Sequence, residues 1–235
     1  MPKYYPVMLD VRDRLAIVVG GDRVAAEKAA ALSASGALVH VICLEFCDEL
    51  LLQAERKQVT LLRKTYEPGD LAGAFVSIAA TSDPGLVQAI WAETQERGQL
   101  VNIVDMPEYC SFIMPSVLRR EQLTIAVSTE GASPGLAKRI RHSLEDIFPP
   151  AYGPYLRLAA LARRYLRSNG ISYERRDDFF SDFFTADVLA RLVEGDSRQA
   201  VARTAELLRN YGIEVSANIL EVGLEEEKTY VNSDR

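Results

Sequence analysis

The chain has 235 residues, 48% of them hydrophobic, which is the composition of a globular protein with a substantial core. Its net charge of -6 argues against a nucleic-acid surface, which needs clustered Lys and Arg. No apolar run reaches the roughly 18 residues of a membrane span, and the first residues lack the apolar core of a secretion signal. We therefore expect a cytoplasmic protein.

The chain has three cysteines, Cys43, Cys47 and Cys110, which cannot all pair with one another. They form neither a CxxC motif nor a Cys/His cluster with zinc spacing. We interpret them as small buried hydrophobic residues in a reducing compartment, and we predict no metal site.

Short apolar runs alternate with helical patterns through the first half of the chain, which predicts a parallel, doubly wound sheet. Leu15–Val19 is a continuous apolar run, as expected of a strand buried on both faces, and residues 23–35 have helical spacing up to Gly36. The elements that follow are the strand 37–43, the helix 46–58, the strands 59–66 and 74–80, the helix 84–97 and the strand 100–104.

The alternation stops after residue 110. Residues 111–115 read as a loop, and residues 123–128 read as a strand with no evident place in the first sheet. An unpaired apolar strand needs a cover, so we expect a second copy of the chain to pair it. Pro134 opens a helix that runs to residue 148, with Ser133 as its N-cap.

The rest of the chain reads as helical, and the acidic segment after Leu224 is expected to fray. The predicted helices span residues 155–168, 173–184, 186–194 and 197–211.

Two glycines, Gly20 and Gly21, lie between a predicted buried strand and a predicted helix. This is the phosphate-binding opening of a dinucleotide fold. The pattern has a glycine where this chain has Asp22, which adds a Cβ and a negative charge beside the expected pyrophosphate. Glu45 follows the next strand, roughly 20 residues on, where a carboxylate binds the ribose hydroxyls. The alternative is that Glu45 caps the helix that follows.

Asp105 follows the apolar strand 100–104, at the edge where open α/β sheets place their ligands. A carboxylate there can accept or deliver a proton. The alternative is a turn or cap residue before Met106-Pro107.

The predicted N-cap Ser133 is followed by three positively charged residues, Lys138, Arg139 and Arg141. A helix N-terminus and nearby cations suit a polycarboxylate ligand, although a solvated helix face explains the same residues. The only histidines, His40 and His142, are interpreted as structural.

A series of motifs along the chain resembles one family closely. The motifs are, in order, Tyr5-Pro6, Val18-Val-Gly-Gly21, Val24-Ala25 with Lys28, Ala79-Ala-Thr81, Val101-Asn-Ile-Val-Asp105, Ser111-Phe-Ile-Met-Pro115, Ile125-Ala-Val-Ser128, Gly131-Ala-Ser-Pro134-Gly-Leu-Ala137 and Arg139-Ile-Arg141. They resemble the sirohaem synthase module, a family of precorrin-2 dehydrogenases, some of which are also sirohydrochlorin ferrochelatases. The resemblance extends from about residue 4 to about residue 210, and its most specific part is the stretch from Asn102 to Ala137.

The resemblance implies a Rossmann-type doubly wound parallel sheet, followed by a dimerisation segment and a helical C-terminal domain. The implied boundaries are 1–113 for the dinucleotide-binding domain, 114–150 for the dimerisation segment, 151–224 for the helical domain and 225–235 for an acidic tail. The implied assembly is an interlocked homodimer.

The resemblance also implies NAD as the hydride acceptor from precorrin-2, which gives sirohydrochlorin; ferrous iron is a further substrate in bifunctional members. The family's key aspartate falls on Asp105, and its third glycine falls on Asp22. A position that can carry a regulatory phosphate on serine falls on Thr129. The residues assigned to the cofactor are Gly20, Gly21, Asp22, Arg23, Val24, Leu44, Glu45, Thr81 and Asn102. Those assigned to the substrate are Ser128, Ser133, Lys138, Arg139 and Arg141.

A second hypothesis is a non-catalytic tetrapyrrole-binding or scaffold homodimer that has lost NAD binding. Asp22 favours this alternative, whereas Asp105 and the intact stretch from Ser128 to Arg141 favour the enzyme. Binding of NAD⁺ discriminates between the two.

Overall fold

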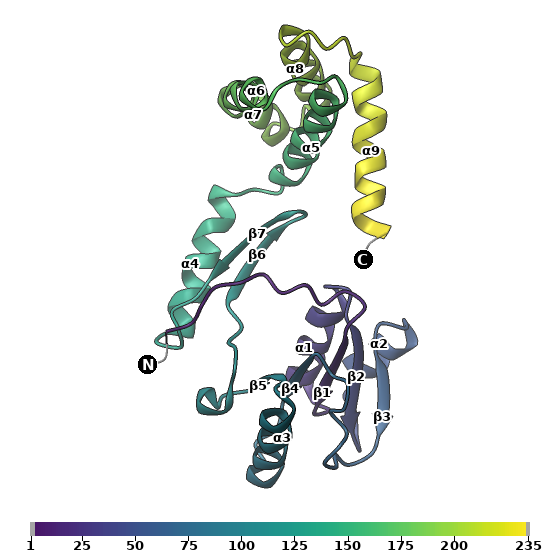
Figure 1. Ribbon diagram of the computed structural model, residues 1–235, viewed down its shortest axis with the longest axis vertical. Helices are drawn as coiled ribbons and strands as arrows, with labels where there is room; N and C mark the ends of the chain where they lie inside the picture. The colour runs from purple at the N-terminus through teal and green to yellow at the C-terminus, as the bar shows by residue number, and fades with distance from the viewer. Residues whose placement is uncertain (1–2, 234–235) are drawn as a thin grey trace. The chain divides into compact units, whose positions relative to one another are not determined.

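The computed structural model describes residues 3–233 and divides into two compact units (Figure 1). Among the described residues, the first unit contains those up to Met114 together with Glu130–Ala132, and the second contains the others. The predicted three-part division with its acidic tail remains a prediction. None of the helices in the described residues is long and apolar enough to cross a membrane.

The first unit contains a five-stranded parallel sheet in the order β3-β2-β1-β4-β5, which confirms the predicted doubly wound α/β fold. Its strands are β1 (Leu15–Val19), β2 (Leu38–Cys43), β3 (Thr60–Arg63), β4 (Val76–Ala79) and β5 (Leu100–Ile103). Its helices are α1 (Arg23–Ser33), α2 (Asp48–Glu55) and α3 (Pro84–Arg97), with a 3₁₀ turn at Pro107–Tyr109.

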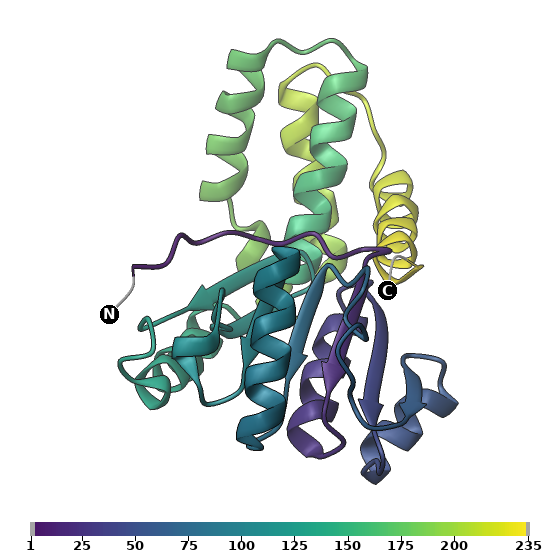
Figure 2. The same cartoon turned by 60° about the horizontal axis from the view of Figure 1, so that its bottom comes forward.

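Helices cover both faces of this sheet (Figure 2). Alternate residues of β1 point to opposite faces, so Ala16 and Val18 pack with α1 and α2, whereas Ile17 and Val19 pack with α3. Both sets are buried, which explains why the sequence of β1 is apolar without interruption.

The outer edge of β5 is closed by the loop after it rather than by a sixth strand. The backbone N–H of Ser111 donates to the Val101 carbonyl at 2.9 Å, and the Ser111 hydroxyl accepts from the Val101 N–H at 2.8 Å. These bonds satisfy backbone groups that would otherwise leave an open sheet edge.

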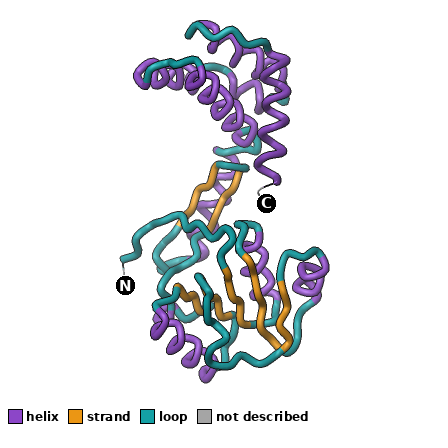
Figure 3. The backbone as a smooth tube through the Cα atoms, turned by 45° about the vertical axis from the view of Figure 1, so that its right-hand side comes forward, coloured by secondary structure: helices purple, strands orange, loops and turns teal. Residues whose placement is uncertain are grey.

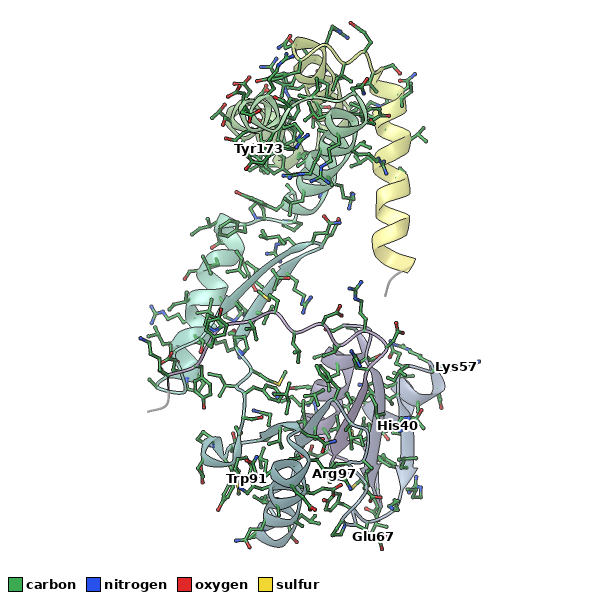
Figure 4. All side chains as sticks on the ribbon, in the orientation of Figure 1. His40, Lys57, Glu67, Trp91, Arg97 and Tyr173 are labelled. Carbon is green, nitrogen blue, oxygen red and sulfur yellow. The ribbon has the colours of Figure 1, made fainter. Side chains whose placement is uncertain are left out.

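Glu93, on α3, is a buried carboxylate with four donors and 6% of its surface exposed. The donors are the Tyr66 hydroxyl at 2.6 Å, the Gly69 and Leu71 backbone N–H groups, and the Arg97 guanidinium at 2.9 Å. Arg97, at the end of α3, is labelled in Figure 4. Burial raises the pKa of Glu93, but these hydrogen bonds outweigh burial and the net pKa is lowered. Glu93 therefore holds the loop before β4 against α3 as an ion.

We predict that Glu93→Gln lowers the free energy of unfolding by about 2 kcal/mol at pH 7, because it removes a charge on which three kinds of donor converge. The pKa of Glu93 in the folded protein lies below the usual value of 4.5. The stability that the carboxylate contributes is therefore complete above pH 4.5 and is lost as the pH falls through the folded pKa. Urea unfolding at pH 7 and at pH 4 measures the difference in free energy of unfolding between the wild type and the variant. An equal difference at both pH values would contradict the ionic role.

The second unit begins with an antiparallel hairpin of β6 (Ser116–Arg120) and β7 (Leu123–Val127), against which α4 (Pro134–Ile147) packs (Figure 3). We expected a second copy of the chain to pair the strand 123–128 because that strand had no partner in the sequence analysis. This premise was wrong, because β6 of the same chain pairs it. The connecting residues are Glu121 and Gln122, and Glu121 has a φ of 54°, in the left-handed region. A turn of this kind normally contains Gly, Asn or Asp, so neither turn residue signals a hairpin.

The five remaining helices share one hydrophobic core, rich in Phe and Leu. They are α5 (Tyr152–Ser168), α6 (Tyr173–Thr185), α7 (Val188–Val193), α8 (Ser197–Asn210) and α9 (Ala217–Ser233). We predicted that the chain frays after Leu224, which was wrong for the residues up to Ser233, because α9 continues to Ser233. The last two residues lie outside the described residues. Leu220 and Leu224 anchor this helix in the core.

Candidate active site

The carboxyl ends of the parallel strands meet at one edge of the sheet in the first unit. The strand order reverses at β1, and β1 and β4 are the neighbours on either side of this switch point. Open α/β sheets bind their ligands at such a point, outside the carboxyl ends. Four turns therefore define the candidate site, and they follow β1, β2, β4 and β5.

The turn after β1 requires both of its glycines. Gly20 has a φ of 141°, and a Cβ there would lie 2.5 Å from the Ala80 carbonyl oxygen. A Cβ on Gly21 would lie 1.9 Å from the carbonyl oxygen of Glu45. The Gly21 carbonyl also accepts from the Cys47 N–H at 2.8 Å. The glycines thus let the β1 turn pack against the turns after β2 and β4.

Asp22 is the N-cap of α1, and its carboxylate accepts from the Ala25 backbone N–H at 2.9 Å. This cap satisfies one of the donors at the helix N-terminus. Arg23 pairs with Glu49 at 3.3 Å and not with Asp22, so the charge of Asp22 is not neutralised by its neighbour. An aspartate at this position stabilises the helix but brings a negative charge to the place where a pyrophosphate binds in this fold.

The other residues predicted for the cofactor lie along the same edge, with one exception. Leu44 and Glu45 are exposed after β2, and Arg23 and Val24 are exposed in the first turn of α1. The Thr81 hydroxyl, after β4, accepts from the Asp83 N–H at 3.2 Å. Asn102 is the exception, because it is buried in β5 and its amide donates to the Phe112 carbonyl at 3.0 Å. That bond anchors the loop at the sheet edge.

Asp105 is exposed and lies in a strained turn directly after β5. Its φ is 62°, and the turn is closed by a hydrogen bond from the Met106 N–H to the Ile103 carbonyl at 3.2 Å. Non-glycine residues with such a φ cluster at functional sites, where the surrounding structure holds them in place.

Cys110, which we took for a plain hydrophobic residue, holds the Asp105 turn. Its sulfur accepts from the Ile103 N–H at 3.1 Å, and its thiol lies 3.2 Å from the Ile103 carbonyl and 3.3 Å from that of Met106. Burial raises the pKa of this thiol, which keeps it protonated as a donor. No motif in the sequence signals such a contact.

The residues predicted for the substrate belong to the second unit and are described within it. Ser128 is exposed and directly follows β7. Ser133 caps α4 as predicted, accepting from the Leu136 N–H at 3.2 Å. Lys138 and Arg139 are exposed, whereas Arg141 forms an ion pair with Glu145. His142 lies beside this pair, and His40 lies within β2, away from the carboxyl ends (Figure 4).

Two known families match consecutive parts of the chain. Residues 7–116 match the family described as "Putative NAD(P)-binding", and residues 120–147 match the family described as "Sirohaem biosynthesis protein central". The chain belongs to the sirohaem synthase module family. This confirms the resemblance found from the motifs.

Curated relatives and one solved structure agree with this family. The sirohaem synthase of Photorhabdus laumondii is 34% identical over 84% of this chain and 42% of its own length, and sirohaem synthase 2 of Klebsiella pneumoniae is 34% identical over 94% and 48%. The chain thus spans less than half the length of these relatives. The structure of SirC, a precorrin-2 dehydrogenase, superposes with a TM-score of 0.71 at 26% identity, over 86% of this chain and 100% of SirC.

We predict that the negative charge of Asp22 weakens NAD⁺ binding. Asp22→Asn keeps the cap of α1 but removes the charge, so it should bind NAD⁺ about fivefold more tightly, which corresponds to about 1 kcal/mol of screened repulsion. Asp22→Gly, which also removes the Cβ, should bind at least as tightly. Calorimetric titration of the three proteins measures the effect, with melting temperatures as the control for folding. Equal or tighter binding by the wild type would show that the turn accommodates the carboxylate.

Proposed function

We propose that this chain is an NAD-dependent precorrin-2 dehydrogenase that produces sirohydrochlorin. The main support is Asp105, an exposed carboxylate in a strained turn at the ligand edge of the sheet. The family resemblance assigns the key aspartate to this position. The match to SirC over its full length supports the same reaction.

The residues of the first unit fit NAD. The β1 turn and the first N–H groups of α1 would hold the pyrophosphate, and Glu45 would accept hydrogen bonds from the adenosine ribose. NAD⁺ bound at this edge supplies the acceptor for a hydride. The protein must in turn supply a base, which takes the proton that the macrocycle loses together with the hydride.

Asp105 is the residue that we assign to this proton. Its carboxylate is exposed, so a substrate can reach it, and the Cys110 contacts fix the turn on which it lies. For the carboxylate groups of the macrocycle, we propose Ser128, Ser133, Lys138, Arg139 and Arg141. Lys138 and Arg139 carry exposed positive charge, whereas the pairing of Arg141 with Glu145 reduces what that residue offers.

Anaerobic incubation of the protein with precorrin-2 and NAD⁺ tests the proposal. We expect the absorbance of sirohydrochlorin and of NADH to rise together, one NADH for each macrocycle. A protein that binds the macrocycle but forms no NADH, and does not bind NAD⁺, would be the scaffold of the alternative hypothesis. Because the curated relatives are named sirohaem synthases, Fe²⁺ or Co²⁺ added after the oxidation then tests for metal insertion.

We predict that Asp105→Ala folds and binds NAD⁺ as the wild type does but loses about 10²–10⁴-fold in dehydrogenase turnover, which is the usual contribution of a general base. Asp105→Asn keeps the turn geometry and should lose a similar factor. The rate of NADH formation measures both variants, and turnover near the wild-type rate in either would contradict the assignment.

We further propose that the protein works as a homodimer through the second unit. Leu136, Ile140 and Ile147 lie along one side of α4, and all three are exposed, as is Val117 on β6. An exposed apolar face of this kind is typical of an interface between protein chains. Because β7 is paired within the chain, an unpaired strand no longer supports a dimer. The exposed apolar face is the observation that supports it instead.

We predict that the melting temperature rises with protein concentration, because an obligate dimer is stabilised by mass action. Ile140→Glu should place a charge in the interface and yield monomers. Sedimentation velocity over a wide range of dilution measures the mass. A single species at the 26.1 kDa of one chain, with a constant melting temperature, would refute the dimer.

A further inference from the structure

The loop Leu44–Phe46, which carries Glu45 at the sheet edge, is held from two sides. On one side lies the β1 turn, with the Cys47 N–H bonded to the Gly21 carbonyl at 2.8 Å and the Glu45 carbonyl against Gly21. On the other side lies Arg63, the last residue of β3, which is in register with Cys43 of β2.

Arg63 contacts the loop on both sides of Glu45. Its Nη1 donates to the Leu44 carbonyl at 2.8 Å, and its guanidinium lies over the Phe46 ring, 5.3 Å from the ring centroid. A planar guanidinium can make a directed hydrogen bond and a cation–π contact at the same time, which a lysine ammonium does less well.

Among the described residues, the Arg63 side chain makes this one hydrogen bond and this one cation–π contact, and it forms no ion pair with a carboxylate. Arg63 makes both of these contacts to the residues that flank Glu45. The contacts therefore fix the backbone position of one carboxylate.

We propose that Arg63 is a positioning residue for the adenosine end of the cofactor site and that it acts through Glu45. This rests on the proposed NAD-dependent function. The bond to Leu44 and the contact with Phe46 hold Glu45 in place before the ribose arrives. Binding then requires less ordering of the loop, which is the general benefit of a preorganised site.

Calorimetric titration with NAD⁺ of the wild type and three variants tests the proposal. Arg63→Met keeps an apolar stem over Phe46 but loses the donor and the charge, and we expect about tenfold weaker binding, the effect of losing one charged hydrogen bond. Arg63→Lys retains a donor and a cation and should recover part of this loss. The matched control is Arg56→Met, which removes an exposed positive charge at the end of α2 without touching the loop.

The double variant of Arg63→Met with Glu45→Gln distinguishes a positioning role of Arg63 from a direct contact between Arg63 and NAD⁺. If Arg63 acts through Glu45, Arg63→Met should weaken binding less than about twofold in the Glu45→Gln background. Nicotinamide mononucleotide, which lacks the adenosine, should bind equally to the wild type and to Arg63→Met. Full additivity of the two substitutions, an equal loss for the mononucleotide, or NAD⁺ binding by Arg63→Met as tight as the wild type's would each overturn the positioning role. Those outcomes leave the proposed function intact, whereas a wild type that does not bind NAD⁺ would overturn both.

Discussion

The close approach of the β1 turn to the turn after β2 is the constraint on which the candidate site depends. Gly21 lies so near the Glu45 carbonyl that a side chain has no room, and Gly20 has the same relation to Ala80. Because of this packing, the ends of β1, β2 and β4 form one continuous edge. In dinucleotide folds the glycines are usually explained by the approach of the pyrophosphate. In this chain they are already required by contacts within the protein.

This packing explains how Asp22 can stand where a third glycine is usual. Gly20 and Gly21 satisfy the steric demand of the turn, so the next position is free to be a helix cap, which Asp22 is. The helix gains a stabilising cap, and the proposed phosphate site receives a charge that Arg23 does not neutralise. On the far side of the switch point, the Asp105 turn is held by Cys110 and by the loop that closes the β5 edge. Residues with little sequence signal thus position the residue to which we assign the proton transfer.

The α/β half of the fold could be predicted because its signals are local. The apolar run of β1, the glycine turn, and Pro84 with Gly98 at the two ends of α3 each indicate a boundary by their own chemistry. The hairpin could not be predicted, because Glu121 adopts a left-handed conformation that its residue type does not signal. The end of α9 was missed because its acidic composition outweighed the two leucines that anchor the helix.

The places of the candidate site residues in the fold could be predicted to the same degree and for the same reason. Glu45 and Asp105 follow apolar strands, so strand ends alone indicate them. By contrast, what singles out Asn102, Cys110 and Arg63 is their contacts, with Phe112, Ile103 and Leu44 respectively. Such contacts appear only when the chain is folded. The motif around Asn102 was correctly assigned to the family, yet the amide of Asn102 serves the loop at the sheet edge.

Titration of Gly21→Ala with NAD⁺ tests most directly whether the glycine turn forms the cofactor site. The added Cβ must displace the Glu45 loop, so we expect a protein that keeps its helical circular-dichroism signal but binds NAD⁺ at least tenfold more weakly than the wild type, by loss of about 1.4 kcal/mol or more. Binding of NAD⁺ to Gly21→Ala with the affinity of the wild type would contradict this role of the turn, because the cofactor would then bind without the edge that the turn creates.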